Sequence, residues 1–469
     1  MRDWMIKSSA MAAVLAMAAA SAMPARAETD WARLQRAAET LRDRAAAESG
    51  AYPLLEGLTT EVGARLAGSP SAKLAAEWMA GKLRGMGFDR VAIETFPIPA
   101  WARGPESAEV IGPRPQKLEL TALGGSVPTP AAGIEAEIVV FPTLDALAAA
   151  PAGSLKGKIA VLVQAMNRTQ EGAGYGAVTP GRRVGPSEAA RKGAVAYLVR
   201  SLSTNTARLP HTGALNYADD APKIPAAALS VPDAELLARM AARGPVKVRL
   251  KLASSVLDGA LGYTVVADIR GREKPEEMVL IGAHLDSWDL GTGAIDDGAG
   301  VAIVSSAARL IGALPQRPRR TVRVVLFGAE EMNWSGGAFA KAHAADAANI
   351  VVASECDFGA ERIYSVQFPP GGAASPFAKA MTAVLGPMPT IMSREPSVVA
   401  GDDLAPLRGI VPQLSMRQDG THYFDIHHSA DDTFDKVDRR AIDQATASWA
   451  AFAYLAADSD VDFRAMAKP

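Results

Sequence analysis

The sequence predicts an α/β protein, in which a mostly parallel or mixed sheet is covered by helices on both faces and a β-rich domain is inserted. The first observation is an alternation of apolar, strand-like runs with amphipathic helical segments from residue 263 onward, which is typical of a sheet buried on both faces. The second is a change of texture between residues 105 and 255, where short apolar runs alternate with Pro- and Gly-rich turns. We therefore expect one domain of residues 28–104 plus 256–469, and an insert of residues 105–255.

Apolar spacing and helix caps define the individual elements of the larger domain. Ser69 and Pro70 predict a helix start, because a serine side chain caps free N–H groups and proline fits the first turn. The predicted strands are residues 91–96, 278–283, 321–327, 350–355 and 411–416. The predicted helices are residues 31–49, 70–86, 300–314, 337–347, 375–384 and 438–457.

Composition excludes some classes of function. The chain has 469 residues, enough for two or three domains, with 49 Lys and Arg against 51 Asp and Glu. Neither a basic excess nor an acidic tail is present, so we expect no nucleic-acid partner. Cys356 is the single cysteine; it rules out an intrachain disulfide, and its apolar surroundings predict a small buried residue rather than a nucleophile.

The first 27 residues have the pattern of a signal peptide. Arg2 and Lys7 precede an Ala-rich apolar run, and Ala25-Arg26-Ala27 forms an A-x-A cleavage site. The alternative is a membrane anchor, but the run is shorter than the roughly 20 residues of a spanning helix. We expect export to the periplasm or the medium, without stable membrane insertion after cleavage.

Acids and histidines follow the predicted strands, where α/β proteins gather their ligands. His284 and Asp286 follow the strand of residues 278–283, Glu330 and Glu331 follow that of residues 321–327, and Asp357 follows that of residues 350–355. Imidazole and carboxylate groups brought together from separate strand ends are the ligands that a metal centre needs. Singly, each has a simpler explanation, such as a structural histidine or a solvated acid pair, and Asp296-Asp297 also suits a helix N-cap.

Four segments give the sequence a resemblance to a known family. They are His284-Leu285-Asp286-Ser287-Trp288-Asp289, Asp296-Asp297-Gly298-Ala299-Gly300, residues 327–331, and His427-His428-Ser429 with Asp432-Thr433. In them the chain resembles the co-catalytic zinc peptidases, which include bacterial aminopeptidases and plasma glutamate carboxypeptidase, also called carboxypeptidase Q. The insert is similar as well, at Pro210-His211-Thr212-Gly213 and Pro222-Lys223-Ile224-Pro225. The resemblance implies the zinc exopeptidase fold, with a protease-associated-like insert.

The resemblance also implies a site. Two Zn²⁺ per subunit would be held by His284 and Asp357 on one side, by Glu331 and His428 on the other, and by Asp296 between them. Glu330 would be the general base, and Asp286 would orient His284. The expected reaction is hydrolysis of dipeptides or short peptides by a metal-bound hydroxide, of carboxypeptidase or dipeptidase type. The resemblance further implies a homodimer in which the insert helps to shape the substrate pocket.

Several residues keep alternative interpretations. His427 stands where relatives have a tyrosine that holds the oxyanion, so it either replaces that donor or only neighbours the site. Asp403 matches a substrate-side loop of the family, against a plain turn, and His211 either reaches the active site or is structural. Asn333 replaces a glycine of the relatives, and asparagine tolerates positive φ.

Three other functions remain as alternatives. An aminopeptidase of the same fold would need an acidic group for the substrate's free amine. A non-catalytic binding module could share this scaffold, and an acyl-transfer or cyclising enzyme would use a single zinc. The presence of all five ligands and the base argues against the binding module.

Overall fold

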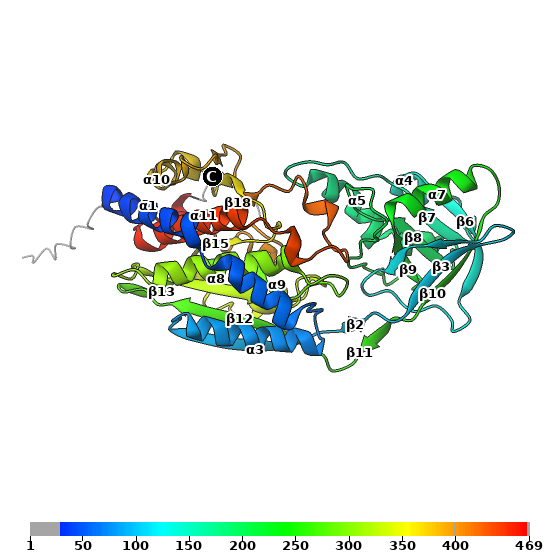
Figure 1. Ribbon diagram of the computed structural model, residues 1–469, viewed down its shortest axis with the longest axis horizontal. Helices are drawn as coiled ribbons and strands as arrows, with labels where there is room; N and C mark the ends of the chain where they lie inside the picture. Colours follow the sequence, from blue (N-terminus) through cyan, green and yellow to red (C-terminus); the bar gives the residue numbers. More distant parts are fainter. Residues whose placement is uncertain (1–28, 398–399, 467–469) are drawn as a thin grey trace, which may run out of the picture.

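Two sheets organise the chain, whose computed structural model describes residues 29–397 and 400–466 (Figure 1). The predicted signal peptide lies outside the described residues. The five-stranded sheet has the order β1 (Arg90–Pro97), β12 (Leu261–Ile269), β14 (Arg320–Phe327), β13 (Lys274–His284), β15 (Ile350–Glu355). Its β14–β13 and β13–β15 pairs are parallel, whereas β1–β12 and β12–β14 are antiparallel. The predicted α/β class with a mixed sheet is confirmed.

Helices cover both faces of this sheet, because successive side chains of a strand point to opposite faces and the central strands are buried almost continuously. Val265, Val279 and Val324 point into a cluster that includes α8 (Ala299–Gly312) and α11 (Arg439–Asp458). Their neighbours Val266, Leu280 and Val325 pack on the opposite face with Phe339 of α9 (Ser335–Ala342) and with Leu404. The remaining helices of this part are α1 (Trp31–Glu48), α2 (Ala51–Gly57), α3 (Pro70–Gly85), α10 (Pro376–Leu385) and α12 (Phe463–Met466).

A separate eight-stranded sheet forms the right-hand part of Figure 1. Its order is β4 (Gln116–Leu118), β3 (Glu106–Ile111), β10 (Lys247–Leu252), β6 (Ile134–Phe141), β7 (Ile159–Leu162), β8 (Ala196–Arg200), β9 (Ala226–Leu229), β5 (Leu120–Ala122). Its helices are α4 (Leu144–Ala148), α5 (Ala173–Arg183), α6 (Gly185–Arg191) and α7 (Val231–Ala241). A two-stranded ribbon of β2 (Ala100–Ala102) and β11 (Ser255–Leu257) lies between this part and the larger sheet (Figure 1).

Two predicted elements differ from the structure. The strand expected at residues 411–416 is β18 (Ser415–Gln418), which pairs with β16 (Ile363–Gln367) in a small sheet that also holds β17 (Ile391–Met392). Residues 412–414 only bridge to β15, and Pro412 has no N–H with which to extend that ladder. The helix expected at residues 337–347 is α9, which ends at Ala342, where His343 pairs with Glu94 of β1 at 2.9 Å.

The cap of α3 and the burial of Cys356 agree with the predictions from the sequence. The Ser69 hydroxyl accepts a hydrogen bond from the Ala72 N–H at 3.2 Å, and Pro70 is the first residue of α3. Cys356 is a buried free cysteine, as expected. In the part of the chain that the structure describes, no helix combines the length and apolarity needed to cross a bilayer.

Candidate metal centre

The carboxyl ends of three parallel strands meet at one edge of the five-stranded sheet. In the register, His284 of β13 lies opposite Phe327 of β14, and Gly282 lies opposite Glu355 of β15. The chain segments that leave β14 and β15 at this edge carry Glu330, Glu331 and Asp357. The sequence therefore brings these acids to His284 through strand pairing alone.

Asp296 lies at the centre of the group of predicted ligands. It belongs to η2 (Ala294–Gly298), the short turn before α8. Its Oδ1 is 3.2 Å from Nε2 of His284, and its Oδ2 is 3.1 Å from Nε2 of His428. The two histidines also contact one further acid each: Asp357 Oδ1 lies 3.5 Å from His284 Nε2, and Glu331 Oε2 lies 3.0 Å from His428 Nε2.

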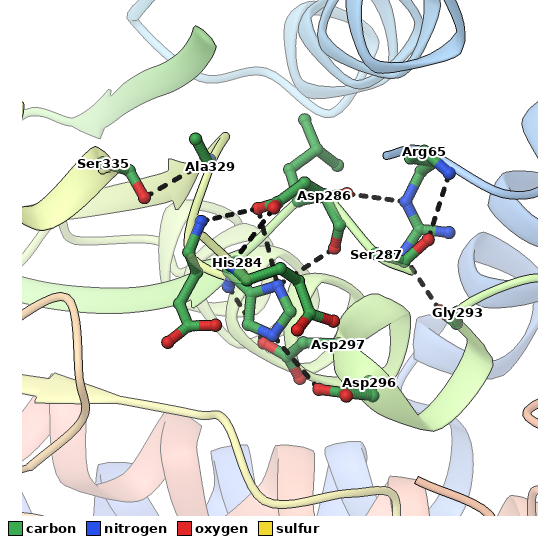
Figure 2. A network of polar contacts seen from close by, with 12 residues as sticks. Arg65, His284, Asp286, Ser287, Gly293, Asp296, Asp297, Ala329 and Ser335 are labelled. Atoms are coloured by element: carbon green, nitrogen blue, oxygen red, sulfur yellow. Dashed lines mark hydrogen bonds and ion pairs between the residues drawn. The ribbon is translucent and has the colours of Figure 1, made fainter. Parts of the chain in front are cut away.

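Asp297, the next residue, has a different task. Its Oδ1 accepts a hydrogen bond from the Gly300 N–H and its Oδ2 accepts one from the His284 N–H, both at 3.0 Å (Figure 2). Gly298 is the N-cap residue of α8, and the carboxylate of the preceding Asp297 accepts an N–H of the first helical turn, while Asp296 faces the histidines. Gly300 is required by close packing, because a Cβ there would lie 2.1 Å from the Cys356 carbonyl and 2.3 Å from the Asp297 carboxylate.

Asp286 connects His284 with the acid pair. Its carboxylate accepts hydrogen bonds from the backbone N–H groups of Glu330, at 2.9 Å, and Glu331, at 3.3 Å. The same carboxylate is 3.7 Å from Nδ1 of His284, which is closer, at 3.0 Å, to the Asp286 carbonyl oxygen. Figure 2 shows Asp286 beside the imidazole on the side away from Asp296. This carboxylate thus positions the Glu330–Glu331 turn as well as the histidine.

Arg65 holds the loop after β13, a role that the sequence analysis did not find. The side chain is fully buried, and its guanidinium donates to the carbonyls of Leu285 at 2.6 Å, Thr292 at 2.7 Å and Gly293 at 3.0 Å (Figure 2). A single Arg in the weakly apolar segment 62–67 carries no pattern that would have predicted this contact. Its effect is to fix the loop that carries Asp286.

The chemistry of this group of side chains fits a cation. Burial raises the pKa of Glu331 to about 7, although His428 acts against this shift. Burial alone would lower the pKa of His428, but the neighbouring carboxylates, Glu331 foremost, raise it to about 10. Glu331 Oε1 and Asp296 Oδ2 are buried and accept no hydrogen bond from any described residue. Such buried oxygens are stabilised by a proton or by a metal ion, and two triads lie within metal-binding reach, His284–Asp296–Asp357 and Asp296–His427–His428.

His427 lines the same pocket as His428. Its Nε2 is 3.5 Å from Asp296 Oδ2, and its ring stacks on that of His428 with 3.5 Å between centroids. Burial foremost lowers its pKa well below the ordinary value, so the ring is neutral. Of the two, His428 is the one in contact with Glu331. The structure thus places His427 next to the predicted ligands, with its Nδ1 free of any hydrogen bond to a described residue.

The part of the chain that forms the eight-stranded sheet supports this pair of histidines through the segment 211–213. The His211 ring lies 2.6 Å from the His427 carbonyl oxygen through Nδ1, and the Thr212 N–H donates to the His428 carbonyl at 2.9 Å. The Thr212 carbonyl in turn lies 3.3 Å from Nδ1 of His428. Burial lowers the pKa of His211 to about 4, so the ring is neutral and donates from Nδ1. His211 lies behind the pocket and not on its wall.

The 401–403 loop places its two acids differently. Asp403 is buried, and its Oδ1 accepts a hydrogen bond from the Ser335 hydroxyl at 2.8 Å. Burial raises its pKa to about 8. Asp402, not Asp403, lines the pocket. Asn333 has a φ of 59°. A positive φ fits a position where the relatives have glycine, and asparagine tolerates it.

A pocket of about 240 Å³ is lined by the residues of the candidate metal centre. The larger sheet contributes Glu330, Glu331 and Asp357, and the insert contributes residues of α5. Its wall also includes Asp296, Asp402, Tyr175, Arg182, Arg183, His427 and His428. Ligand pockets usually measure about 300–1,000 Å³, so this one suits a small molecule.

The fold and this site together define the class of the protein, a zinc-dependent metallo-exopeptidase. Residues 264–453 match the model of peptidase family M28. Carboxypeptidase Q of Bos taurus is 36% identical over 417 residues, which cover 88% of this chain and 86% of that protein. The chain belongs to peptidase family M28. The family resemblance inferred from the sequence is thereby confirmed.

Solved structures agree with this assignment. A peptidase M28 precursor from Shewanella amazonensis superposes with a TM-score of 0.89 at 45% identity, over 92% of this chain and 98% of that one. A zinc aminopeptidase from Bacillus subtilis has a TM-score of 0.64 at 18% identity, over 88% of this chain and 96% of that one. The second likeness shows the shared fold alone.

Proposed function

We propose that this enzyme hydrolyses dipeptides or short peptides with two zinc ions, as a carboxypeptidase or dipeptidase. His284 and Asp357 would hold one ion, Glu331 and His428 the other, and Asp296 would bridge them. The observation that carries the proposal is the position of Asp296, whose two oxygens face different histidines at 3.2 Å and 3.1 Å. A bridging carboxylate needs this two-sided arrangement.

Glu330 is the general base of the proposed reaction. Bound zinc supplies Lewis-acid polarisation of the scissile carbonyl and lowers the pKa of a water molecule. The Glu330 carboxylate lies on the pocket wall, and its backbone is fixed by Asp286. It takes a proton from the attacking water and gives it to the leaving amine. Glu331, one residue further, points its Oε2 to His428 instead.

The shape of the site supports short substrates. The pocket has a volume of about 240 Å³, and residues of α5 form part of its wall, so it suits a short peptide. The similarity to relatives named carboxypeptidase Q supports cleavage at the free carboxyl end of the substrate. The Bacillus subtilis enzyme is named an aminopeptidase. Aminopeptidase action is therefore the second candidate, and Asp402 on the pocket wall is the acid available for a substrate amine.

Substitution of Glu330 by glutamine tests the mechanism. We expect Glu330→Gln to keep its bound metal and to lose turnover by about 10³-fold or more, because the base is removed while the ligands remain. Glu77→Gln, at an exposed position of α3, is the matched control. Metal content by mass spectrometry and kcat on a dipeptide library give the answer. Near-normal turnover of Glu330→Gln would refute its role.

Metal stoichiometry separates the remaining alternatives. Two zinc ions per chain together with chelation-sensitive hydrolysis support the proposal. One ion per chain would favour the acyl-transfer or cyclising enzyme, and none would favour a binding module. We also propose that residues 105–255 act as the insert domain, that the enzyme works after export, and that it forms a homodimer; sedimentation of the purified protein tests the last point.

A further inference from the structure

Two adjacent arginines of the insert line the pocket beside the metal centre. Arg182 and Arg183 form the C-terminal end of α5, and they are the only Arg or Lys side chains among the described residues of the pocket wall. Arg182 is 3% exposed, whereas Arg183 is half-buried. The rest of the wall is rich in acids that the proposed metal ions would occupy. A buried cation on this wall therefore needs its own explanation.

Arg182 has no charged partner in the part of the chain that the structure describes. No carboxylate lies within ion-pair distance of its guanidinium there, and its Nε makes no hydrogen bond. Its one hydrogen bond is long, from Nη1 to the Thr212 carbonyl at 3.5 Å, and its guanidinium lies over the Tyr175 ring at 5.4 Å. Buried arginines are almost always paired with an anion. The donors of Arg182 thus remain available on the pocket wall.

The surrounding chain is shaped to hold this guanidinium. A Cβ at position 213 would lie 2.3 Å from Arg182 Nη1 and 2.4 Å from Cζ, so only glycine leaves room there. The Thr212 carbonyl that receives Arg182 also lies 3.3 Å from Nδ1 of His428. The same peptide therefore fixes the arginine and the predicted zinc ligand relative to each other.

We propose that Arg182 binds the free terminal carboxylate of the peptide substrate. A guanidinium pairs with a carboxylate through two parallel hydrogen bonds, and it does so most strongly where water is excluded. This assignment rests on the proposed function and adds the residue that selects a free carboxyl end. Arg183 adds positive charge at the same end of α5, and its Nη2 lies 3.5 Å from the Asn333 side chain.

Paired substrates test the assignment. Alanyl-alanine and its C-terminal amide differ only in the carboxylate, and we measure kcat/KM for both with the zinc-loaded wild type, Arg182→Gln and Arg182→Lys. The wild type is expected to prefer the free acid. Arg182→Gln should lose about 10- to 100-fold on the free acid, mainly through KM, and change little on the amide, since one charged hydrogen-bond pair is removed. Arg182→Lys should keep part of the preference.

A binding measurement makes the result independent of turnover. Calorimetric titration of Glu330→Gln with alanyl-alanine should show binding that the added Arg182→Gln substitution weakens. Arg239→Gln, at an exposed position of α7, is the control. Equal losses on acid and amide, or a wild type without preference, would overturn the assignment. If no peptide is hydrolysed but binding still depends on Arg182, the proposed function fails and the carboxylate site stands.

Discussion

Adjacent residues in this enzyme have separate tasks, and the pair Asp296–Asp297 shows it most clearly. One carboxylate faces two histidines, and the other accepts two backbone N–H groups. Glu330 and Glu331 both line the pocket, but of the two it is Glu331 that contacts His428. Side chains that follow each other along an irregular turn point in different directions, so two adjacent residues of the same chemistry can have different roles.

The two aspartates can be distinguished by substitution. We expect Asp296→Asn to lower zinc affinity strongly and to leave the metal-free fold intact, because it removes a charge but no backbone partner. Asp297→Asn should lower the stability of the metal-free protein by about 1–2 kcal/mol, since an amide has one acceptor oxygen where the carboxylate uses two. Zinc titration and thermal unfolding of metal-free protein measure the two effects. If both variants changed the same quantity by the same amount, the division of tasks would be wrong.

At this scale the sequence predicted which acids and histidines meet at one edge of the sheet, and their role as metal ligands stays a prediction. Residue type and position after a strand indicated His284, Glu331 and Asp357, and the structure brings them together with Asp296 and His428. Arg65 and Arg182 were missed. Their partners are backbone carbonyls or an open pocket, and neither leaves a residue pattern that a single sequence can show.

The loop between β13 and η2 is the element on which the site depends. It carries Asp286, and three of its carbonyls accept hydrogen bonds from Arg65, which comes from the segment between α2 and α3. The Ser287 hydroxyl accepts a further bond from the Arg65 backbone N–H at 3.0 Å. The N-terminal segment is thereby part of the site's support, although it supplies no predicted ligand.

Removal of the Arg65 guanidinium tests this support. Arg65→Met is expected to destabilise the protein by about 3–5 kcal/mol, because buried carbonyls lose their donors. Zinc affinity should fall with it, since Asp286 and Asp296 lie at the two ends of the loop. Arg36→Met, at an exposed position of α1, is the control. Urea unfolding and zinc titration are the measurements, and unchanged values for both would contradict the assigned role.

Elements were predictable where local and tertiary preferences agree. The caps and apolar faces of α3, α8 and α11 are visible in the sequence, and their bounds came within a few residues. The strand around residue 411 was misplaced because an apolar run does not reveal which sheet it joins. The sheet that this segment joins depends on Pro412 and on the pairing of β16 with β18. These contacts join residues that are distant in the sequence.

Across the whole molecule, the insert and the loop of residues 419–432 form one support for the histidines. Arg168 of the insert makes two hydrogen bonds to Asp425, at 2.9 Å and 2.6 Å, and Thr204 makes another at 2.8 Å. The segment 211–213 then contacts His427 and His428 directly. The sequence predicted an insert, but only the three-dimensional arrangement shows that Arg168, Thr204 and His211 contact the loop that carries His427 and His428.

Metal removal should therefore loosen both parts together. Without a cation, the repulsion among Asp296, Glu331 and Asp357 is relieved only by protons, so the backbone that carries His428 is expected to open more often. Hydrogen exchange measured by mass spectrometry should rise at residues 420–432 and also at residues 201–213, while α11, whose residues are mostly buried away from the site, keeps its protection. Restoring zinc should reverse both changes. Faster exchange confined to residues 420–432 would mean that the insert is only a neighbour of the metal centre, because two segments joined by these hydrogen bonds cannot open independently.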